Sequence, residues 1–124
     1  MNYLATVLII ILVFLSAKAN ASKTALIYHS NYYDSHTNVK TQLEADGYTV
    51  TLSTTGTVDE NLINSYDVVY DMKYNNSIGS NGKDRYQAFV QAGGVLVLVG
   101  ENNGSFSNNN QTIEAFIENK LGGT

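Results

Sequence analysis

The sequence predicts an α/β fold, a parallel sheet with helices on both faces. Three observations support this prediction. Short apolar or alternating runs typical of strands recur along the chain, amphipathic segments separate them in strict alternation, and glycines stand where the helical segments end. Strict alternation is typical of parallel sheets, because each parallel connection must cross back over the sheet. With 124 residues, the chain has room for one small domain.

The amino terminus precedes this pattern and is typical of an export signal. Residues 4–15 are apolar apart from one threonine, a run shorter than the roughly 20 residues that cross a bilayer. Two A-x-A cleavage patterns follow, ending at Ala19 and Ala21, so we expect residues 1–21 to be a signal peptide removed before Ser22. The first residues carry no Lys or Arg, which leaves an uncleaved membrane anchor as the alternative. We expect a secreted, periplasmic or cell-surface protein, without stable membrane insertion once the signal is cleaved.

The first two strands and the helix between them follow this signal. Residues 24–28 form a short apolar run, which predicts a buried strand. A helix capped by Asp34 or Ser35 is expected next, and Gly47 stands where its end needs a left-handed residue. Residues 49–53 then alternate polar and apolar side chains with a period of two. This alternation predicts a half-exposed strand at one edge of the sheet.

The middle of the chain continues the alternation. Thr57 and Glu60 match the ends of a capping box that opens a short helix. Residues 67–72 predict the third strand, and a polar loop over residues 74–82 leads into a helix that ends at residues 93–94. The predicted buried stripe of that helix comprises Tyr86, Phe89 and Val90.

The last part of the chain contains a strand with no polar residue. Residues 95–99 (VLVLV) predict the fourth strand, and a polar loop over residues 100–110 precedes the last helix. The simplest right-handed arrangement is the flavodoxin-like order 2-1-3-4, which places this strand at an edge. An open apolar edge favours association. We therefore expect that the chain is truncated after the fourth helix, with further strands in a longer protein, or that residues 95–99 pair with another chain.

Two segments resemble the core of a known superfamily. Residues 66–71 (YDVVYD) and residues 92–102 (AGGVLVLVGEN) are similar to the class I glutamine amidotransferase-like superfamily, most of all to cysteine-free, ThuA-like secreted bacterial domains. The resemblance covers about residues 24–123 and implies the flavodoxin-like sheet but no activity. In catalytic members a cysteine nucleophile follows the fourth strand, where Glu101 or Asn102 stands here. The chain has no cysteine, so the mechanism of that family is excluded.

Several chemically active side chains follow the predicted strands. Ligands of open α/β sheets bind beyond the carboxyl ends of the strands. His29 and His36 follow the first strand, and Asp71 and Glu101 are expected at the ends of the third and fourth. Imidazole and carboxylate groups hold divalent metals or act as general base and orienting acid, so a hydrolase, with or without a metal, is one hypothesis. In the alternative, which we predict, no metal is bound and the carboxylates accept hydrogen bonds from backbone N–H groups at the turns.

The same edge is rich in tyrosine and asparagine. The candidate ligand-binding residues are Asn31, Tyr32, Tyr33, Asp34, Tyr74, Asn102 and Asn103. Such side chains suit contacts with carbohydrate or protein, although asparagine is also the ordinary residue of turns. Tyr32 and Tyr33 stand where a flavin-binding loop needs small residues, and no dinucleotide-binding or P-loop motif is present. We therefore predict no cofactor.

The charge of the chain excludes one class of partner. Seven basic residues are scattered among eleven acidic ones, for a net charge of −4, whereas nucleic-acid-binding proteins cluster Lys and Arg on one face. The sequence thus predicts a secreted, non-catalytic structural or ligand-binding module, residues 22–124, at the amino-terminal end of a larger extracellular protein. The alternatives are the hydrolase and an extracellular subunit that self-assembles through residues 95–99.

Overall fold

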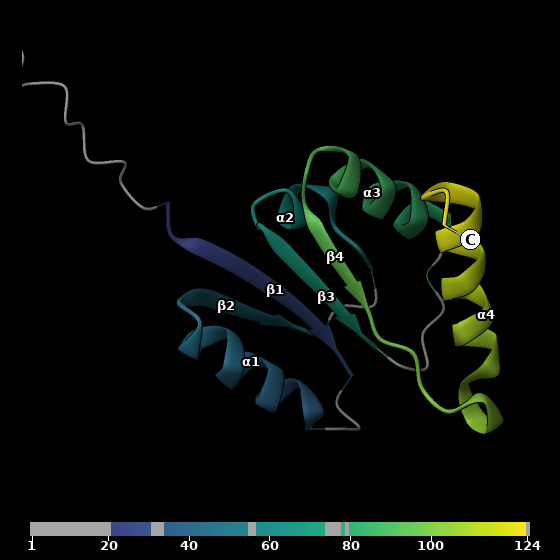
Figure 1. The fold of residues 1–124 in the computed structure, drawn as a ribbon, viewed down its shortest axis with the longest axis horizontal. Helices are drawn as coiled ribbons and strands as arrows, with labels where there is room; N and C mark the ends of the chain where they lie inside the picture. Colours follow the sequence, from purple (N-terminus) through teal and green to yellow (C-terminus); the bar gives the residue numbers. More distant parts are fainter. Residues whose placement is uncertain (1–20, 31–33, 55–56, 74–77, 79, 124) are drawn as a thin grey trace, which may run out of the picture.

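The computed structural model describes residues 21–30, 34–54, 57–73, 78 and 80–123 (Figure 1). These residues form one parallel sheet with the strand order β2-β1-β3-β4, as predicted. The strands are β1 (Lys23–His29), β2 (Tyr48–Ser53), β3 (Val68–Met72) and β4 (Val95–Leu98). The helices alternate with them and are α1 (Ser35–Ala45), α2 (Glu60–Ile63), α3 (Ser80–Gln91) and α4 (Asn103–Lys120). The predicted signal peptide, except Ala21, lies outside the described residues.

The helices cover both faces of the sheet, as predicted. Helix α1 lies on one face, and α2, α3 and α4 lie on the other (Figure 1). Right-handed connections require this arrangement, because the chain first moves outward from β1 to β2 and then returns across β1 to β3 and β4. Strand β1 is therefore central, and its residues from Ala25 to Tyr28 are fully buried.

Alternate residues of β1 belong to two separate hydrophobic clusters. Leu26 and Tyr28 face the larger cluster under α2, α3 and α4, which also contains Tyr86 and Phe116. The other members of this cluster are Val58, Ile63, Val69, Ile78 and Phe89. The smaller cluster, on the α1 side, consists of Ala25, Ile27, Leu43, Val68 and Met72. Each face of the sheet thus has its own core, which is expected for a strand whose neighbouring residues point to opposite sides.

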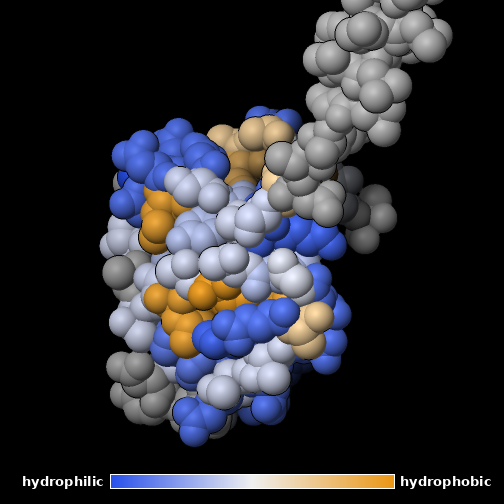
Figure 2. All heavy atoms as spheres, turned by 90° about the vertical axis from the view of Figure 1, so that its left-hand side faces the viewer, coloured by the Kyte–Doolittle hydropathy of each residue, from blue (hydrophilic) through white to orange (hydrophobic). Residues whose placement is uncertain are grey.

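The two edge strands are exposed to different extents. Strand β2 alternates half-buried and exposed positions over most of its length, as its sequence pattern predicts. Strand β4 is apolar throughout, yet Val95 is 53% exposed. The reason is that β4 has one strand neighbour among the described residues. Figure 2 shows the side of the molecule on which β2 and α1 lie, where apolar side chains form small areas among hydrophilic ones.

One predicted helix start is wrong, and another is confirmed in its position but not in its capping bond. The capping box at Thr57 is wrong: α2 begins at Glu60, and the carboxylate of Asp59 accepts the N–H groups of Asn61 and Leu62 at 2.9 and 3.3 Å. An aspartate directly before a helix is a strong cap, and it outcompetes the threonine two residues earlier. Asp34 does hold the N-cap position of α1, but its side chain makes no capping hydrogen bond.

The last two helices begin inside segments predicted as polar loops. Helix α4 starts at Asn103 rather than after Asn110, because the Asn102 side chain caps it by accepting the N–H of Ser105 at 3.1 Å. Its first turn is set off by a kink at Phe106, where φ is −121°. Helix α3 likewise starts at Ser80. A helical segment rich in Asn, Ser and Gly is indistinguishable from a loop by composition, and in α4 the Asn102 cap decides it.

Candidate functional site

The switch point of the sheet lies between β1 and β3, whose onward connections run over opposite faces. Ligands of open α/β sheets bind at the carboxyl ends of such strands. Here Tyr28 is in register with Asp71, and His29 with Met72. Residues in register on parallel strands share a face, so Asp71 points with Tyr28 toward α2, α3 and α4, and His29 points toward α1.

Asp71 is the centre of a buried polar network. Its side chain is accompanied by that of Lys73, and the two residues are only 6% and 4% exposed. The hydroxyl of Tyr86 donates to Oδ2 of Asp71 at 2.7 Å, and Nζ of Lys73 lies 3.4 Å from the same oxygen. The other oxygen, Oδ1, accepts the backbone N–H of Lys73 at 3.2 Å. Both carboxylate oxygens are thus engaged by groups of this chain.

Tyr28 connects this network to β1 and to the start of α2. The ammonium of Lys73 lies 4.9 Å from the centroid of the Tyr28 ring, within the range of a cation–π contact. The Tyr28 hydroxyl accepts the backbone N–H of Asp59 at 3.3 Å. Side chains from β1, from the end of β3 and from α3 therefore meet at one end of the sheet, next to the backbone N–H of the residue that caps α2. We call Tyr28, Asp71, Lys73 and Tyr86 the switch-point network.

The electrostatics of the network keep both tyrosines protonated. Burial, together with the neighbouring Asp71 carboxylate, raises the pKa of Tyr86 far above its usual range. Burial also raises the pKa of Tyr28, against the opposing effect of the N–H that it accepts from Asp59. Tyr86 thus remains a hydrogen-bond donor to Asp71 over the whole range in which the protein would work. The hydroxyl of Tyr86 therefore stays bound to Oδ2 of Asp71, on the same oxygen that Lys73 approaches.

Sequence reasoning selected Asp71 but missed Lys73, Tyr28 and Tyr86 as polar participants. Both tyrosines were assigned to the core, which is correct for their rings but overlooks their hydroxyl groups. The available signal was the spacing of Asp71 and Lys73, two residues apart at the end of a strand otherwise made of apolar side chains and tyrosine. Buried charges of opposite sign that close together require each other, and a buried tyrosine hydroxyl requires a partner.

The two histidines are brought together by the structure. Their rings stack with centroids 3.8 Å apart and an angle of 18° between the planes. Nδ1 of His29 lies 3.2 Å from the carbonyl oxygen of Ser30, so this nitrogen is placed to donate to it. His29 points to the opposite face of the sheet from Asp71. Within the described ranges, no three His, Asp or Glu side chains are grouped so that they could hold a metal ion.

Glu101 follows β4 in a turn that is held by Asn110 of α4. The Glu101 N–H donates to Oδ1 of Asn110 at 3.0 Å, and Nδ2 of Asn110 donates to the Glu101 carbonyl. The same Nδ2 donates to Oδ1 of Asn103 at 2.7 Å. A Cβ at Gly100 would lie 2.9 Å from Oδ1 of Asn110, so the clasp fits a glycine there. Asn110, which sequence reasoning left in a loop, therefore fixes the backbone of this turn.

The predicted ligand-binding rim is described in part. Asn31, Tyr32, Tyr33 and Tyr74 lie outside the described residues. The remaining candidates, Asp34, Asn102 and Asn103, are exposed. Asn102 and Asn103 take part in hydrogen bonds at the start of α4, as described above. These bonds fix the start of α4 whether or not the rim binds a ligand.

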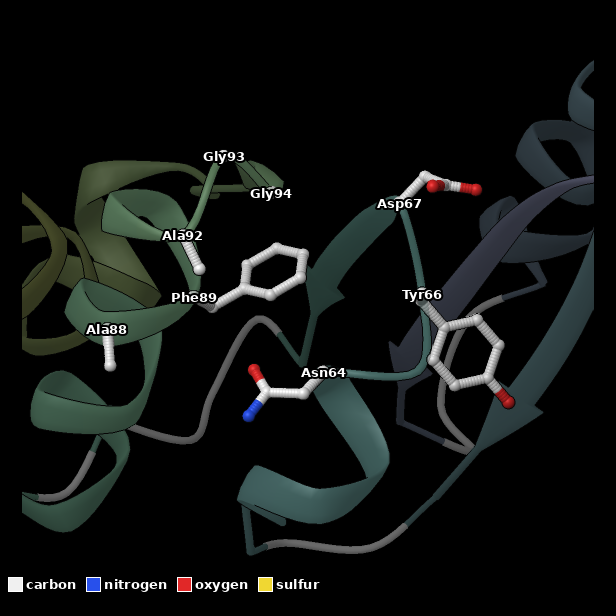
Figure 3. A pocket seen from close by; sticks show the side chains of 8 residues that line it. All are labelled: Asn64, Tyr66, Asp67, Ala88, Phe89, Ala92, Gly93 and Gly94. Atoms are coloured by element: carbon white, nitrogen blue, oxygen red, sulfur yellow. The ribbon is translucent and has the colours of Figure 1, made fainter. Parts of the chain in front are cut away.

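A pocket of about 440 Å³ opens at the other end of the sheet, near the amino ends of β3 and β4 (Figure 3). Its lining comprises Asn64, Tyr66, Asp67, Ala88, Phe89, Ala92, Gly93 and Gly94. The Phe89 ring projects from α3 toward its middle, whereas the side chains of Tyr66 and Asp67 turn away from Phe89 (Figure 3). The walls are thus mainly backbone, alanine and one aromatic ring, without a converging set of charged groups.

Gly93 and Gly94 shape this pocket by ending α3 as predicted. Gly93 has a φ of +96°, and the N–H groups of Gly93 and Gly94 donate to the carbonyls of Val90 and Phe89, each at 3.0 Å. This is the Schellman pattern, which satisfies the last carbonyls of the helix. A Cβ on Gly94 would lie 2.3 Å from Cζ of Phe89, so the ring rests directly on the glycine backbone.

Comparison with known proteins gives a distant likeness of fold. No protein-family model matches the chain, and no curated protein matches it. One solved structure that matches is a ThuA-like protein from Bacteroides uniformis ATCC 8492, with 17% identity and a TM-score of 0.49. The match covers 62% of this chain and 35% of that one, so this chain spans about a third of its length.

Proposed function

We propose that this chain is an exported, non-catalytic α/β module that acts as a structural or ligand-binding part of a larger extracellular protein. The observation that carries the proposal is the engagement of Asp71. At the position where an open α/β sheet receives its ligand, both oxygens of this carboxylate are already bound by Lys73 and Tyr86. The carboxylate thus serves to hold β3 to α3 through the hydrogen bond from Tyr86.

The main alternative is a hydrolase that uses the histidines with Asp71 and Glu101. A general base and its orienting carboxylate must lie within hydrogen-bond reach, about 2.6–3.2 Å. His29 points toward α1 and Asp71 toward α3, which separates them by the thickness of the sheet. The geometry therefore favours the binding module over the hydrolase. It leaves the exposed surface at the start of α4, including Asn102 and Asn103, for contact with protein or carbohydrate.

Export and superfamily membership belong to the same proposal. The apolar residues 4–15 and the A-x-A pattern ending at Ala21 support a cleaved signal. Cleavage there leaves every described element intact, because β1 begins at Lys23. Among the described residues no helix is long and apolar enough to cross a membrane. The strand order and the position of Glu101 after β4 support a relation to cysteine-free members of the class I glutamine amidotransferase-like superfamily.

Metal analysis distinguishes the module from the hydrolase. The chain from Ser22 to Thr124 is incubated with Zn²⁺, Mn²⁺ or Fe²⁺, dialysed and analysed by elemental mass spectrometry. The variant His29→Ala/His36→Ala serves as the control. We expect no stoichiometric metal in either protein. Metal retained by the wild type and lost in the variant would overturn the proposal in favour of the hydrolase.

Export is tested with the full chain carrying a carboxyl-terminal tag in a bacterial host. Intact mass spectrometry of the tagged protein from the periplasm or medium measures where the chain begins. We expect a protein that starts at Ser22. A tagged protein recovered with its first residues from the cytoplasm contradicts export, and one recovered from the membrane fraction identifies the uncleaved anchor.

A further inference from the structure

We propose that the groove between α2 and α3 binds a neutral oligosaccharide. This inference rests on the proposed function, because it names the ligand of that module and the place where it binds. The groove consists of the pocket described above, of about 440 Å³, and two further pockets of about 390 and 480 Å³. Helices α2 and α3 lie next to each other on the same face of the sheet (Figure 1). We call the three pockets together the α2–α3 groove.

The three pockets adjoin along α3. Ala88 lines the first and second pockets, and Arg85 lines the second and third. Arg85, Ala88 and Ala92 follow one another at intervals of three and four residues, so they share a face of the helix. From Arg85 to Ala92 an α-helix rises about 10 Å, at about 1.5 Å per residue. The groove is therefore longer than one sugar ring and suits a short chain of rings.

Arg85 stands in the middle of the groove and is held in place by the backbone. Its Nη1 donates to the carbonyl oxygen of Val58, directly before the cap of α2. A guanidinium carries five N–H groups in a rigid plane, and this bond engages one of its nitrogens. Because Arg85 is half-buried and lines two of the pockets, its other N–H groups are placed to donate to a ligand there.

Three carboxylates line the same two pockets as Arg85. Asp59 lines the third pocket, and Glu60 and Asp84 line the second. Oδ1 of Asp59 accepts two N–H groups at the start of α2, and Oδ1 of Asp84 accepts Nζ of Lys120 at 3.0 Å. In the described part of the chain these bonds fix two of the carboxylates and use one oxygen of each. The groove thus combines a fixed donor with oriented acceptors.

This mixture of charges selects a neutral ligand with hydroxyl groups. Arg85 and Lys120 offset two of the three carboxylates, which leaves the groove with little net charge. A guanidinium only donates hydrogen bonds and a carboxylate only accepts them, whereas a hydroxyl does both. A basic ligand would meet Arg85 and an acidic one would meet the carboxylates, and a charge buried without a partner is unfavourable.

The geometry of these groups favours a sugar over a peptide. Guanidinium and carboxylate groups each offer two parallel hydrogen bonds, which match neighbouring hydroxyls of one sugar ring. The N–H and C=O groups of an extended peptide instead point to opposite sides in turn. A sugar therefore uses the paired donors and acceptors of the groove more completely.

Apolar side chains supply the rest of the surface. The Phe89 ring projects into the first pocket, and the Asn64 amide extends from the end of α2 toward α3 (Figure 3). Leu62 lines the third pocket, and Ala88 lies between the other two. Ligand sites combine apolar walls with a few placed polar groups, and a sugar ring has an apolar C–H face and a polar rim. The groove fits both parts of such a ring.

A titration followed by ¹⁵N NMR tests the ligand. The protein is the chain from Ser22 to Thr124, which retains every described element and both hydrophobic clusters. The probes are the neutral trisaccharides cellotriose, maltotriose and triacetylchitotriose, with chitosan trisaccharide and trigalacturonate as the basic and acidic counterparts. We expect a neutral trisaccharide to bind and to shift the resonances of α2 and α3 but not those of α1.

Three outcomes of this titration would overturn the proposal. The first is a dissociation constant above about 10 mM for every neutral trisaccharide. The second is tighter binding of either charged trisaccharide. The third is a set of shifts confined to the start of α4, which would place the ligand at Asn102 and Asn103.

Filling the groove tests the place of binding. Ala88 is exposed where the first two pockets meet, so Ala88→Leu occupies the groove without entering the core. The matched control is Ala45→Leu, at an exposed alanine of α1. We expect Ala88→Leu to raise the dissociation constant at least about tenfold, as extra methyl groups in a fitted site do, and Ala45→Leu to leave it unchanged. Equal constants in the two variants, with both shown to be folded by circular dichroism, would overturn the proposal.

Removing one acceptor tests the recognition by charged groups. Glu60 is exposed at the start of α2, and Glu118 is an exposed glutamate of α4 outside the groove. We expect Glu60→Ala to weaken binding about tenfold, the effect of losing a hydrogen bond to a charged group, and Glu118→Ala to have no effect. The same affinity in both variants would contradict this recognition.

Failure of this inference is distinguishable from failure of the proposed function. An exported, metal-free chain that binds no neutral trisaccharide refutes the groove alone. A chain that retains stoichiometric metal through its histidines, or that cleaves a bound trisaccharide, refutes the non-catalytic module instead.

Discussion

The two ends of the sheet use similar residues in opposite ways. At the carboxyl end, Asp71 is 6% exposed and bound to Lys73 and Tyr86. At the amino end, Asp67 is exposed, and its Oδ2 accepts the backbone N–H and the hydroxyl of Thr24 at 2.7 and 3.0 Å. The first aspartate therefore joins helices to the sheet, whereas the second joins β3 to β1 at the surface. A carboxylate at the usual ligand-binding end is not thereby free for a ligand, because its burial and partners decide its role.

Among variants at the two ends of the sheet, Lys73→Met is expected to lower the free energy of unfolding most. This change leaves the Asp71 carboxylate buried without its cation, and breaking a buried pair in this way costs about 3–5 kcal/mol. Urea unfolding followed by circular dichroism measures the free energy of unfolding. A loss below about 1 kcal/mol, the value of an exposed ion pair, would show that Asp71 and Lys73 are open to water.

A smaller effect at the same end is expected for Tyr86→Phe. The ring and its packing remain, but Asp71 loses a hydrogen bond to a charged group, worth about 1.5–3 kcal/mol. The matched control is Tyr66→Phe, a half-buried tyrosine outside the switch-point network, which should cost less than about 0.5 kcal/mol. Equal losses in the two variants would contradict a special role for the Tyr86 hydroxyl.

At the amino end, Gly94→Ala is expected to destabilise the protein by about 1–3 kcal/mol through overpacking. The new Cβ would lie 2.3 Å from the Phe89 ring, which must move. Gly93→Ala is the control, because its φ of +96° is strained for alanine but no atom lies within 4 Å of the new Cβ. We expect about 1 kcal/mol there from the backbone alone. The crystal structure of Gly94→Ala should show a displaced Phe89, and an unmoved ring would refute the packing argument.

The smallest effect is expected at Asp67 and depends on pH. Hydrogen bonds from the backbone N–H and hydroxyl of Thr24 lower the pKa of Asp67 from 3.8. Because the folded pKa is the lower one, this contribution to stability is present above pH 3.8 and is lost as the pH falls through the folded pKa. Asp67→Asn keeps an acceptor but does not titrate, so its stability should fall less between pH 5 and pH 2. Parallel pH profiles of the two proteins would contradict this assignment.

Much of the fold could be predicted because it depends on apolar patterns. The buried run of β1, the alternation of β2 and the terminal Gly47 and Gly93 are local signals, and the structure confirms each. The start of α4 could not be predicted from composition, because it depends on which asparagine caps the helix. Hydrogen bonds of Asn102 and Asn110 decide this, and they form only after the turn has folded.

The candidate site could be predicted only in outline. The sequence pattern predicts Asp71 near the carboxyl end of the third strand, and Asp71 does lie there. The face to which each side chain points depends on the exact register of β1 and β3, which a one-residue shift reverses. This register pairs His29 with Met72 and separates it from Asp71. Of the partners of Asp71, Lys73 is two residues away, but Tyr86 is 15 residues away in the chain, a distance at which no local pattern operates.

A double-mutant cycle between Asp71 and Lys73 tests most directly whether Asp71 is committed to the network. The free energies of unfolding are measured for Asp71→Asn, Lys73→Met and the double variant. We predict that each single variant is destabilised and that the double variant recovers a coupling of about 1–3 kcal/mol, because it removes both buried charges together. Additive losses, within about 0.5 kcal/mol, would contradict the account and leave Asp71 available for chemistry.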